Sequence, residues 1–154
     1  MGPGKYLKQT MIKYIFFLVS VFLLGISCRK LKEEVSQSVV EKYFENNVIN
    51  KDFVVTLAKD STADFTSDYN GYKFVLLKTD FYHGPLRATK GSNVYEGSWA
   101  SNEDYSKLTI VLPSSPSEFK FLTRDWRFIK KDVPTLKLSP WYNRDPVLLY
   151  MTRE

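Results

Sequence analysis

The stretch Tyr105-Ser-Lys-Leu-Thr-Ile-Val-Leu112 decides the fold, because its side chains alternate between two faces. From Lys107 onward, one face carries only aliphatic side chains, those of Leu108, Ile110 and Leu112. The other face carries a lysine, a threonine and a valine. A period of two residues, rich in β-branched side chains, is typical of a strand that buries one face.

The same period recurs along most of the chain beyond residue 50, and polar residues, glycines and prolines separate its segments. Eight strands of this kind with short connections favour an all-β, up-and-down antiparallel barrel, because closure removes the exposed strand edges. A sandwich of two sheets is the alternative. The other seven predicted strands are Phe53–Lys59, Tyr72–Lys78, Leu86–Thr89, Asn93–Ala100, Trp126–Lys130, Leu136–Ser139 and Val147–Thr152.

Two short helices interrupt this pattern. Before the sixth strand, Ser115-Pro116-Ser117-Glu118 has the residue order of a capping box, which predicts a helix of about two turns through Thr123. Phe119 and Leu122 would face inward from it. Nearer the N-terminus, apolar side chains at helical spacing predict an amphipathic helix within Val35–Asn46.

Gly97 lies between Tyr95 and Trp99 on the predicted inward face of the fourth strand. A glycine inside a strand often marks a bend or a close approach of another backbone segment. The sequence therefore predicts crowding at this position, and His83-Gly84 and Lys90-Gly91 are predicted as turns.

The N-terminal region has the pattern of a bacterial lipoprotein signal. Lys8 and Lys13 precede the 11-residue apolar run Tyr14–Leu24, and Gly25-Ile-Ser27 leads to Cys28, the chain's one cysteine. We expect residues 1–27 to be removed, with Met1 or Met11 as the start, and Cys28 to receive a diacylglycerol and palmitate. A membrane-spanning anchor, which needs about 20 apolar residues, and a plain secretory signal are the alternatives.

This organisation predicts three parts: signal peptide 1–27, acylated tether and short helix 28–50, and barrel domain 51–154. Three of the 22 Lys and Arg residues lie in the signal, whereas all 17 acidic residues lie after it. Processing therefore lowers the formal net charge from +5 to +2. So small a net charge does not indicate binding of nucleic acid. A single cysteine excludes an internal disulfide.

Residues that could carry chemistry are scattered, and we predict neither an enzyme nor a metal or cofactor site. His83 is the one histidine, and no Gly-x-Ser-x-Gly motif is present. Asp60, Asp64 and Asp68 recur every four residues but lack the spacing of a calcium loop, which favours a solvated loop. A glycosidase needs two catalytic carboxyl groups, and Glu96 and Glu118 are the candidates for such a pair. Glu118, however, is expected to cap a helix.

The remaining candidates are aromatic residues on the predicted inward faces of the strands. Such a face in an eight-stranded barrel lines either a packed interior or a small ligand cavity. The predicted ligand-binding residues are Tyr72, Phe74, Tyr95, Trp99, Trp126 and Phe128.

From about Asn46 to Glu154 the chain resembles the lipocalin-like lipoproteins of the Bacteroidota. The segments that carry the resemblance are Thr66–Phe74, Ala88–Ser92, Gly97-Ser-Trp99, Asp125-Trp126 and Leu148–Thr152. The family pattern opens with Gly-x-Trp and closes with Phe-x-Lys, whereas this chain has Lys51-Asp-Phe53 and Met151-Thr-Arg153. The resemblance implies a lipocalin-like barrel, in a family whose members mostly have no assigned ligand.

Together these features predict a lipid-anchored lipoprotein of the bacterial outer membrane, facing the periplasm or the cell surface. Its expected role is non-enzymatic binding of a small apolar or amphipathic ligand inside the barrel. The alternative is a packed barrel whose outer surface binds a protein or a glycan at the cell envelope.

Overall fold

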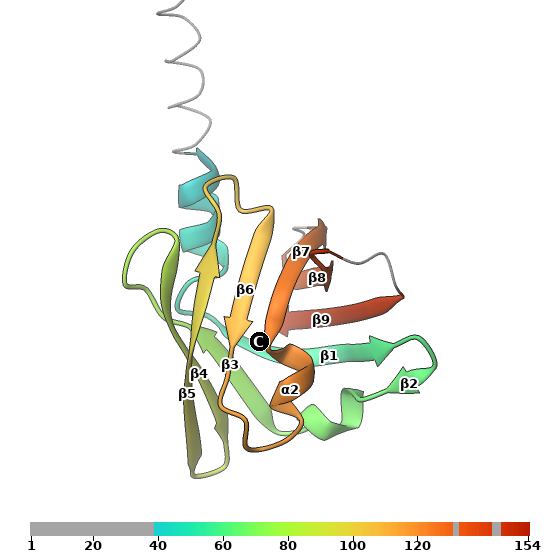
Figure 1. The fold of residues 1–154 in the computed structure, drawn as a ribbon. Coiled ribbons are helices and arrows are strands. Elements are labelled where there is room, and N and C mark those ends of the chain that lie inside the picture. The colour runs from blue at the N-terminus through green and yellow to red at the C-terminus, as the bar shows by residue number, and fades with distance from the viewer. Residues whose placement is uncertain (1–38, 131–132, 143–145) are drawn as a thin grey trace, which may run out of the picture. The chain divides into compact units, whose positions relative to one another are not determined.

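The structure, a computed structural model shown in Figure 1, describes residues 39–130, 133–142 and 146–154. The chain divides into two compact units, Met1–Val39 and Val40–Glu154, and the second contains the barrel. The predicted signal peptide, Cys28 and the tether up to residue 38 lie outside the described residues.

Eight antiparallel strands close into a barrel, which confirms the predicted all-β barrel and excludes the sandwich of two sheets. Each strand pairs with the next along the chain, and the last strand pairs with the first through seven residue pairs that begin at Phe53↔Arg153. A ninth strand, β2 (Ala63–Asp64), adds two residues beside the end of the first. The eight barrel strands are β1 (Asp52–Asp60), β3 (Tyr72–Leu76), β4 (His83–Lys90), β5 (Asn93–Ser101), β6 (Lys107–Val111), β7 (Arg124–Lys130), β8 (Thr135–Pro140) and β9 (Val147–Arg153).

The alternation of apolar residues sets which side chains enter the barrel. Leu108 and Ile110 on β6 are buried and oppose Trp126 and Arg124 of β7. On β1 the alternation changes phase at Thr56, where the pairing with β9 shifts by a bulge. A bulge inserts one extra residue, so the inward positions before and after it no longer differ by an even number.

Strand β4 begins at His83, so the predicted turn at His83-Gly84 is wrong. The chain turns around Asp80 instead, whose Oδ1 accepts hydrogen bonds from the backbone N–H groups of Tyr82 (2.7 Å) and His83 (2.9 Å). Gly84 pairs with Trp99, and a Cβ atom at Gly84 would lie 2.0 Å from the carbonyl oxygen of Leu77. The glycine serves a close backbone approach within the sheet rather than a turn.

The polar connection after β1 contains more structure than the sequence predicts. It holds β2 and the 3₁₀ helix η1 (Thr66–Tyr69). The Asp64 carboxylate accepts a hydrogen bond from the Thr66 N–H at 2.9 Å, and the Thr66 hydroxyl accepts one from the Ala58 N–H at 3.0 Å. Local hydrogen bonds of this kind hold the segment without any apolar period.

A single helical turn, α2 (Phe119–Leu122), precedes β7. Phe119 and Leu122 are buried, as the sequence predicts. The capping box is wrong: the helix begins after Glu118 without a side-chain cap, and the Glu118 carboxylate instead accepts a hydrogen bond of 2.9 Å from the Tyr72 hydroxyl. A partner from a distant strand has replaced the local one.

Residues 39–47 form a helix. Figure 1 shows this helix and α2 at opposite ends of the barrel. Phe44 of the helix, with Val48 and Ile49 after it, belongs to the hydrophobic core. Glu41 accepts a hydrogen bond from the Tyr82 hydroxyl, and Glu45 forms an ion pair with Lys78. The segment that the sequence assigns to the tether therefore contributes packing to the domain from Val40 onward.

Candidate functional site

The six aromatic residues predicted to face inward are all part of the core or packed against it, but they do not form one site. Tyr72, Phe74, Trp99 and Trp126 are at most 2% exposed, and Tyr95 and Phe128 are partly buried. They fall into two groups, one beneath the helix 39–47 and one beneath α2.

Trp99 and Phe128 belong to the first group. Both pack on Phe44, and their ring centroids lie 5.8 Å and 6.3 Å from that of Phe44. The Tyr105 ring centroid lies 4.4 Å from the same point. The Trp99 indole N–H donates to the carbonyl oxygen of Leu77 at 2.7 Å. The polar atom of this buried tryptophan is therefore satisfied by the protein itself.

Tyr72, Phe74 and Tyr95 belong to the second group and surround Phe119 of α2. Their ring centroids lie 5.2–6.4 Å from that of Phe119. Trp126 packs nearby on Phe121, with 5.7 Å between the ring centroids, and its indole N–H donates to the Leu122 carbonyl oxygen at 2.9 Å.

Further side chains fill the hydrophobic core on which both groups pack. Apolar residues from five strands, β3, β4, β6, β8 and β9, are less than 3% exposed. Protein interiors are packed about as densely as organic crystals, so a ligand could enter only by displacing such side chains. These residues are Leu76, Leu86, Leu108, Ile110, Leu136, Leu138, Leu149 and Met151.

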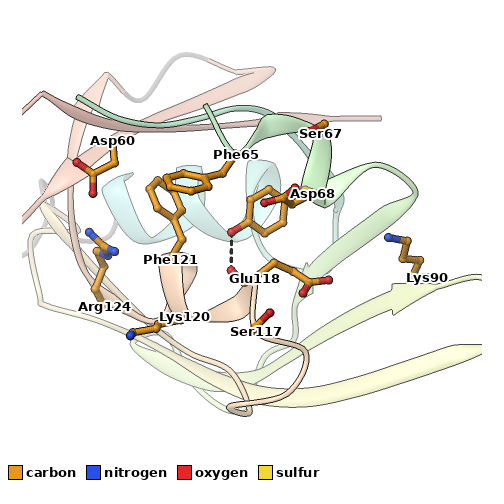
Figure 2. A pocket seen from close by; sticks show the side chains of 11 residues that line it. Asp60, Phe65, Ser67, Asp68, Lys90, Ser117, Glu118, Lys120, Phe121 and Arg124 are labelled. Atoms are coloured by element: carbon orange, nitrogen blue, oxygen red, sulfur yellow. Dashed lines mark hydrogen bonds between the residues drawn. The ribbon is translucent and has the colours of Figure 1, made fainter. Parts of the chain in front are cut away.

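A large surface cavity, which we call the η1–α2 groove, lies at the α2 end of the barrel and has a volume of about 790 Å³. This volume is within the range of ligand pockets, about 300–1,000 Å³. None of the six predicted aromatic residues lines it. Figure 2 shows the lining side chains, which come from η1, α2 and the adjoining strand ends: Asp60, Phe65, Ser67, Asp68, Tyr69, Lys90, Ser117, Glu118, Lys120, Phe121 and Arg124.

Aromatic rings and a hydrogen-bonded glutamate form the inner wall of the groove. The Phe65 and Phe121 ring centroids are 5.4 Å apart. The Tyr69 hydroxyl donates to the Glu118 carbonyl oxygen at 2.6 Å, the dashed line in Figure 2. Burial raises the pKa values of the Tyr69 and Tyr72 hydroxyls, and Glu118 adds to both shifts. Both hydroxyls therefore stay protonated and keep donating to Glu118 at neutral pH.

Three cations line the groove. Arg124 lies over Phe121, with its guanidinium carbon 5.0 Å from the ring centroid, and 5.2 Å from that of Trp126. The Lys90 ammonium lies 4.5 Å from the Tyr72 ring centroid. Within the described part of the chain, neither Arg124 nor Lys120 forms an ion pair. Their charges remain available to a ligand.

Sequence reasoning missed this groove because its residues were assigned to other roles. Ser117 and Glu118 are assigned to a helix cap, and Asp60 and Asp68 to a solvated loop. Lys120 and Arg124, four residues apart, are the one local signal that could have pointed to it. Lys120 lies on α2 and Arg124 is the first residue of β7, so this short spacing keeps two cations close together where the helix ends and the strand begins.

The acidic and histidine candidates are not gathered into a catalytic centre. His83 Nδ1 lies 2.9 Å from Asp80 Oδ2 on the exposed start of β4. Glu96 pairs with Arg87 across β5 and β4, with 2.8 Å between Oε1 and Nε, whereas Glu118 immediately precedes α2. Over residues 39–130, 133–142 and 146–154, no three His, Cys, Asp or Glu side chains lie together as metal ligands would.

The helices within the described residues are all too short or too polar to cross a lipid bilayer. Comparisons of the chain with protein-family models, with curated proteins and with solved structures found no match.

Proposed function

We propose that this chain is a lipid-anchored envelope lipoprotein whose packed barrel acts as a non-enzymatic binding module through its outer surface. The observation that carries the proposal is the filled interior: Trp99, Trp126 and Phe74 are at most 1% exposed and contact other side chains of the protein. This packing supports the surface role over carriage of an apolar ligand inside the barrel.

Energetics support the same choice. A ligand inside the barrel would have to displace at least one buried aromatic side chain. Removing such a side chain from a core costs about 3–5 kcal/mol. The surface groove needs no such displacement, because its volume of about 790 Å³ is already open.

The anchor rests on the apolar run and Cys28. If Cys28 is acylated, residues 29–39 connect the lipid to the barrel unit, which begins at Val40. Eleven residues span at most about 36–40 Å when extended. The barrel would then be held near the membrane while its surface stays accessible to a partner in the surrounding space.

The test is titration of the mature protein with a fluorescent fatty acid, compared with the Trp99→Leu and Trp126→Leu variants. Leu keeps the interior apolar but removes the ring contacts. We expect no saturable uptake by the wild-type protein, and at most weak uptake by the variants, in which a cavity is created. Saturable wild-type uptake that is weakened in both variants would instead establish carriage of a ligand within the barrel.

A further inference from the structure

We propose that the η1–α2 groove binds a carbohydrate that carries a carboxylate, such as a uronic acid unit of a polysaccharide. The sugar ring would pack on Phe65 and Phe121, and its carboxylate would lie between Lys120 and Arg124. This inference rests on the proposed function, because it names the ligand class of the surface that the packed barrel leaves available.

The aromatic part of the groove fits the apolar face of a sugar ring. Phe65 is half-buried and offers most of the accessible aromatic surface, whereas Phe121, whose ring is tilted by 45° from that of Phe65, is only 9% exposed. The C–H groups on one face of a pyranose ring are apolar and pack well on aromatic carbon. A ring held there has its hydroxyl groups directed toward the polar walls of the groove.

The cationic end of the groove fits a carboxylate. Figure 2 shows Lys120 and Arg124 at the same end, beside Phe121. The Arg124 guanidinium is held by its contacts with Phe121 and Trp126. A guanidinium presents paired N–H donors that match the two oxygens of a carboxylate, and such charge-assisted hydrogen bonds are stronger than neutral ones.

The remaining lining residues favour a sugar over a polyanion. Asp60 lies at the same end as Arg124 in Figure 2, and Asp68 and Glu118 lie farther along the groove. These carboxylates would repel an acidic peptide or a nucleic acid backbone. Sugar hydroxyls can donate hydrogen bonds to them and accept hydrogen bonds from Lys90 and Ser117. One anionic group on a ligand rich in hydroxyls matches this mixture.

A smaller cavity borders the η1–α2 groove. This second cavity of about 300 Å³ shares Ser117 and Lys120 with it and is otherwise lined by Leu112, Pro113, Ser114 and Thr123. The shared residues make the two cavities neighbours on the surface. Two neighbouring cavities suit an oligosaccharide chain better than a single sugar.

The experiment is calorimetric titration of the mature protein in detergent micelles with a neutral xylo-oligosaccharide that carries a single glucuronic acid unit and with the methyl ester of that sugar, which has no carboxylate charge. We expect the acid to bind and the ester to bind about tenfold more weakly, because the ester cannot form charge-assisted hydrogen bonds with Lys120 and Arg124. Lys120→Gln and Arg124→Gln should each weaken binding of the acid by a similar factor. Phe65→Leu should weaken the binding of both sugars.

Arg87→Gln is the matched control, because Arg87 is an exposed cation on β4 that pairs with Glu96 away from the groove. It should leave binding unchanged. Lys120→Gln removes an exposed side chain, so loss of binding in that variant does not reflect loss of the fold.

The proposal is overturned if the folded wild-type protein binds neither sugar, if acid and ester bind equally, or if tetraglutamate peptide binds as well as the acidic sugar. None of these results would support binding of an apolar ligand inside the barrel. Whether a ligand is carried inside the barrel is decided by the fatty-acid titration. The two experiments therefore distinguish a wrong ligand class for the groove from a wrong proposed function.

Discussion

Gly97 shows how one missing side chain lets two strands approach. A Cβ atom at this position would lie 2.2 Å from the Val111 carbonyl oxygen and 3.0 Å from Leu112 Cδ2. The close approach predicted from the sequence is thereby confirmed. We expect Gly97→Val to lower the free energy of unfolding by about 1–3 kcal/mol through overpacking. Urea denaturation measures this, with Ser98→Val, an exposed neighbour on β5, as the control. Equal stability of both variants would contradict the observed packing.

Asp80 makes the stability of the turn before β4 dependent on pH. The hydrogen bond from the Tyr82 N–H holds the pKa of the Asp80 carboxyl below its usual value, and the His83 N–H and imidazole add to the effect. A lowered folded-state pKa stabilises the fold above the unfolded value, about 4, and this contribution is lost as the pH falls through the folded value. Asp80→Ala should therefore lower the Tm at neutral pH, and the difference from wild type should shrink in acid. A difference independent of pH would contradict this assignment.

At the scale of elements, helix 39–47 closes one end of the barrel. Phe44 is 4% exposed, and its ring contacts those of Trp99, Tyr105 and Phe128. We expect Phe44→Ala to cost about 3–5 kcal/mol of unfolding free energy. Lys42→Ala, an exposed position of the same helix, should change it little. Denaturant unfolding that gave the two variants equal stabilities would mean that this helix is not part of the domain.

The elements also show which features a sequence can predict. The eight strands follow from an alternation that is local in the chain, so their existence could be predicted. The failure of the capping box could not be predicted from the local sequence, because the Glu118 carboxylate binds Tyr72, which lies 46 residues earlier in the chain. The η1–α2 groove could not be predicted for the same reason, because its lining residues are spread along the chain from Asp60 to Arg124. Only the closed barrel brings such residues together.

At the scale of the whole molecule, Cys28 is predicted to be the membrane attachment. A bound acyl chain contributes roughly 0.8 kcal/mol per buried methylene, so a diacylglycerol holds more firmly than one chain. Cys28→Ser should abolish incorporation of labelled palmitate and release the protein from the membrane fraction of a bacterial host. Gly25→Ala, a nearby change in the signal that keeps the cysteine, should not. Full membrane association of Cys28→Ser would show that the attachment lies elsewhere.

The barrel is filled by its own side chains, and the indole N–H groups of Trp99 and Trp126 report on this packing directly. Each donates to a backbone carbonyl oxygen, of Leu77 and Leu122 respectively, and each tryptophan is at most 1% exposed. Buried, hydrogen-bonded groups in a packed core exchange with solvent only through large opening events. Hydrogen–deuterium exchange followed by NMR should therefore show both indoles protected as strongly as the slowest backbone amides. Rapid exchange of either indole in a protein whose strand amides stay protected would reveal a water-filled lumen and contradict the packed barrel.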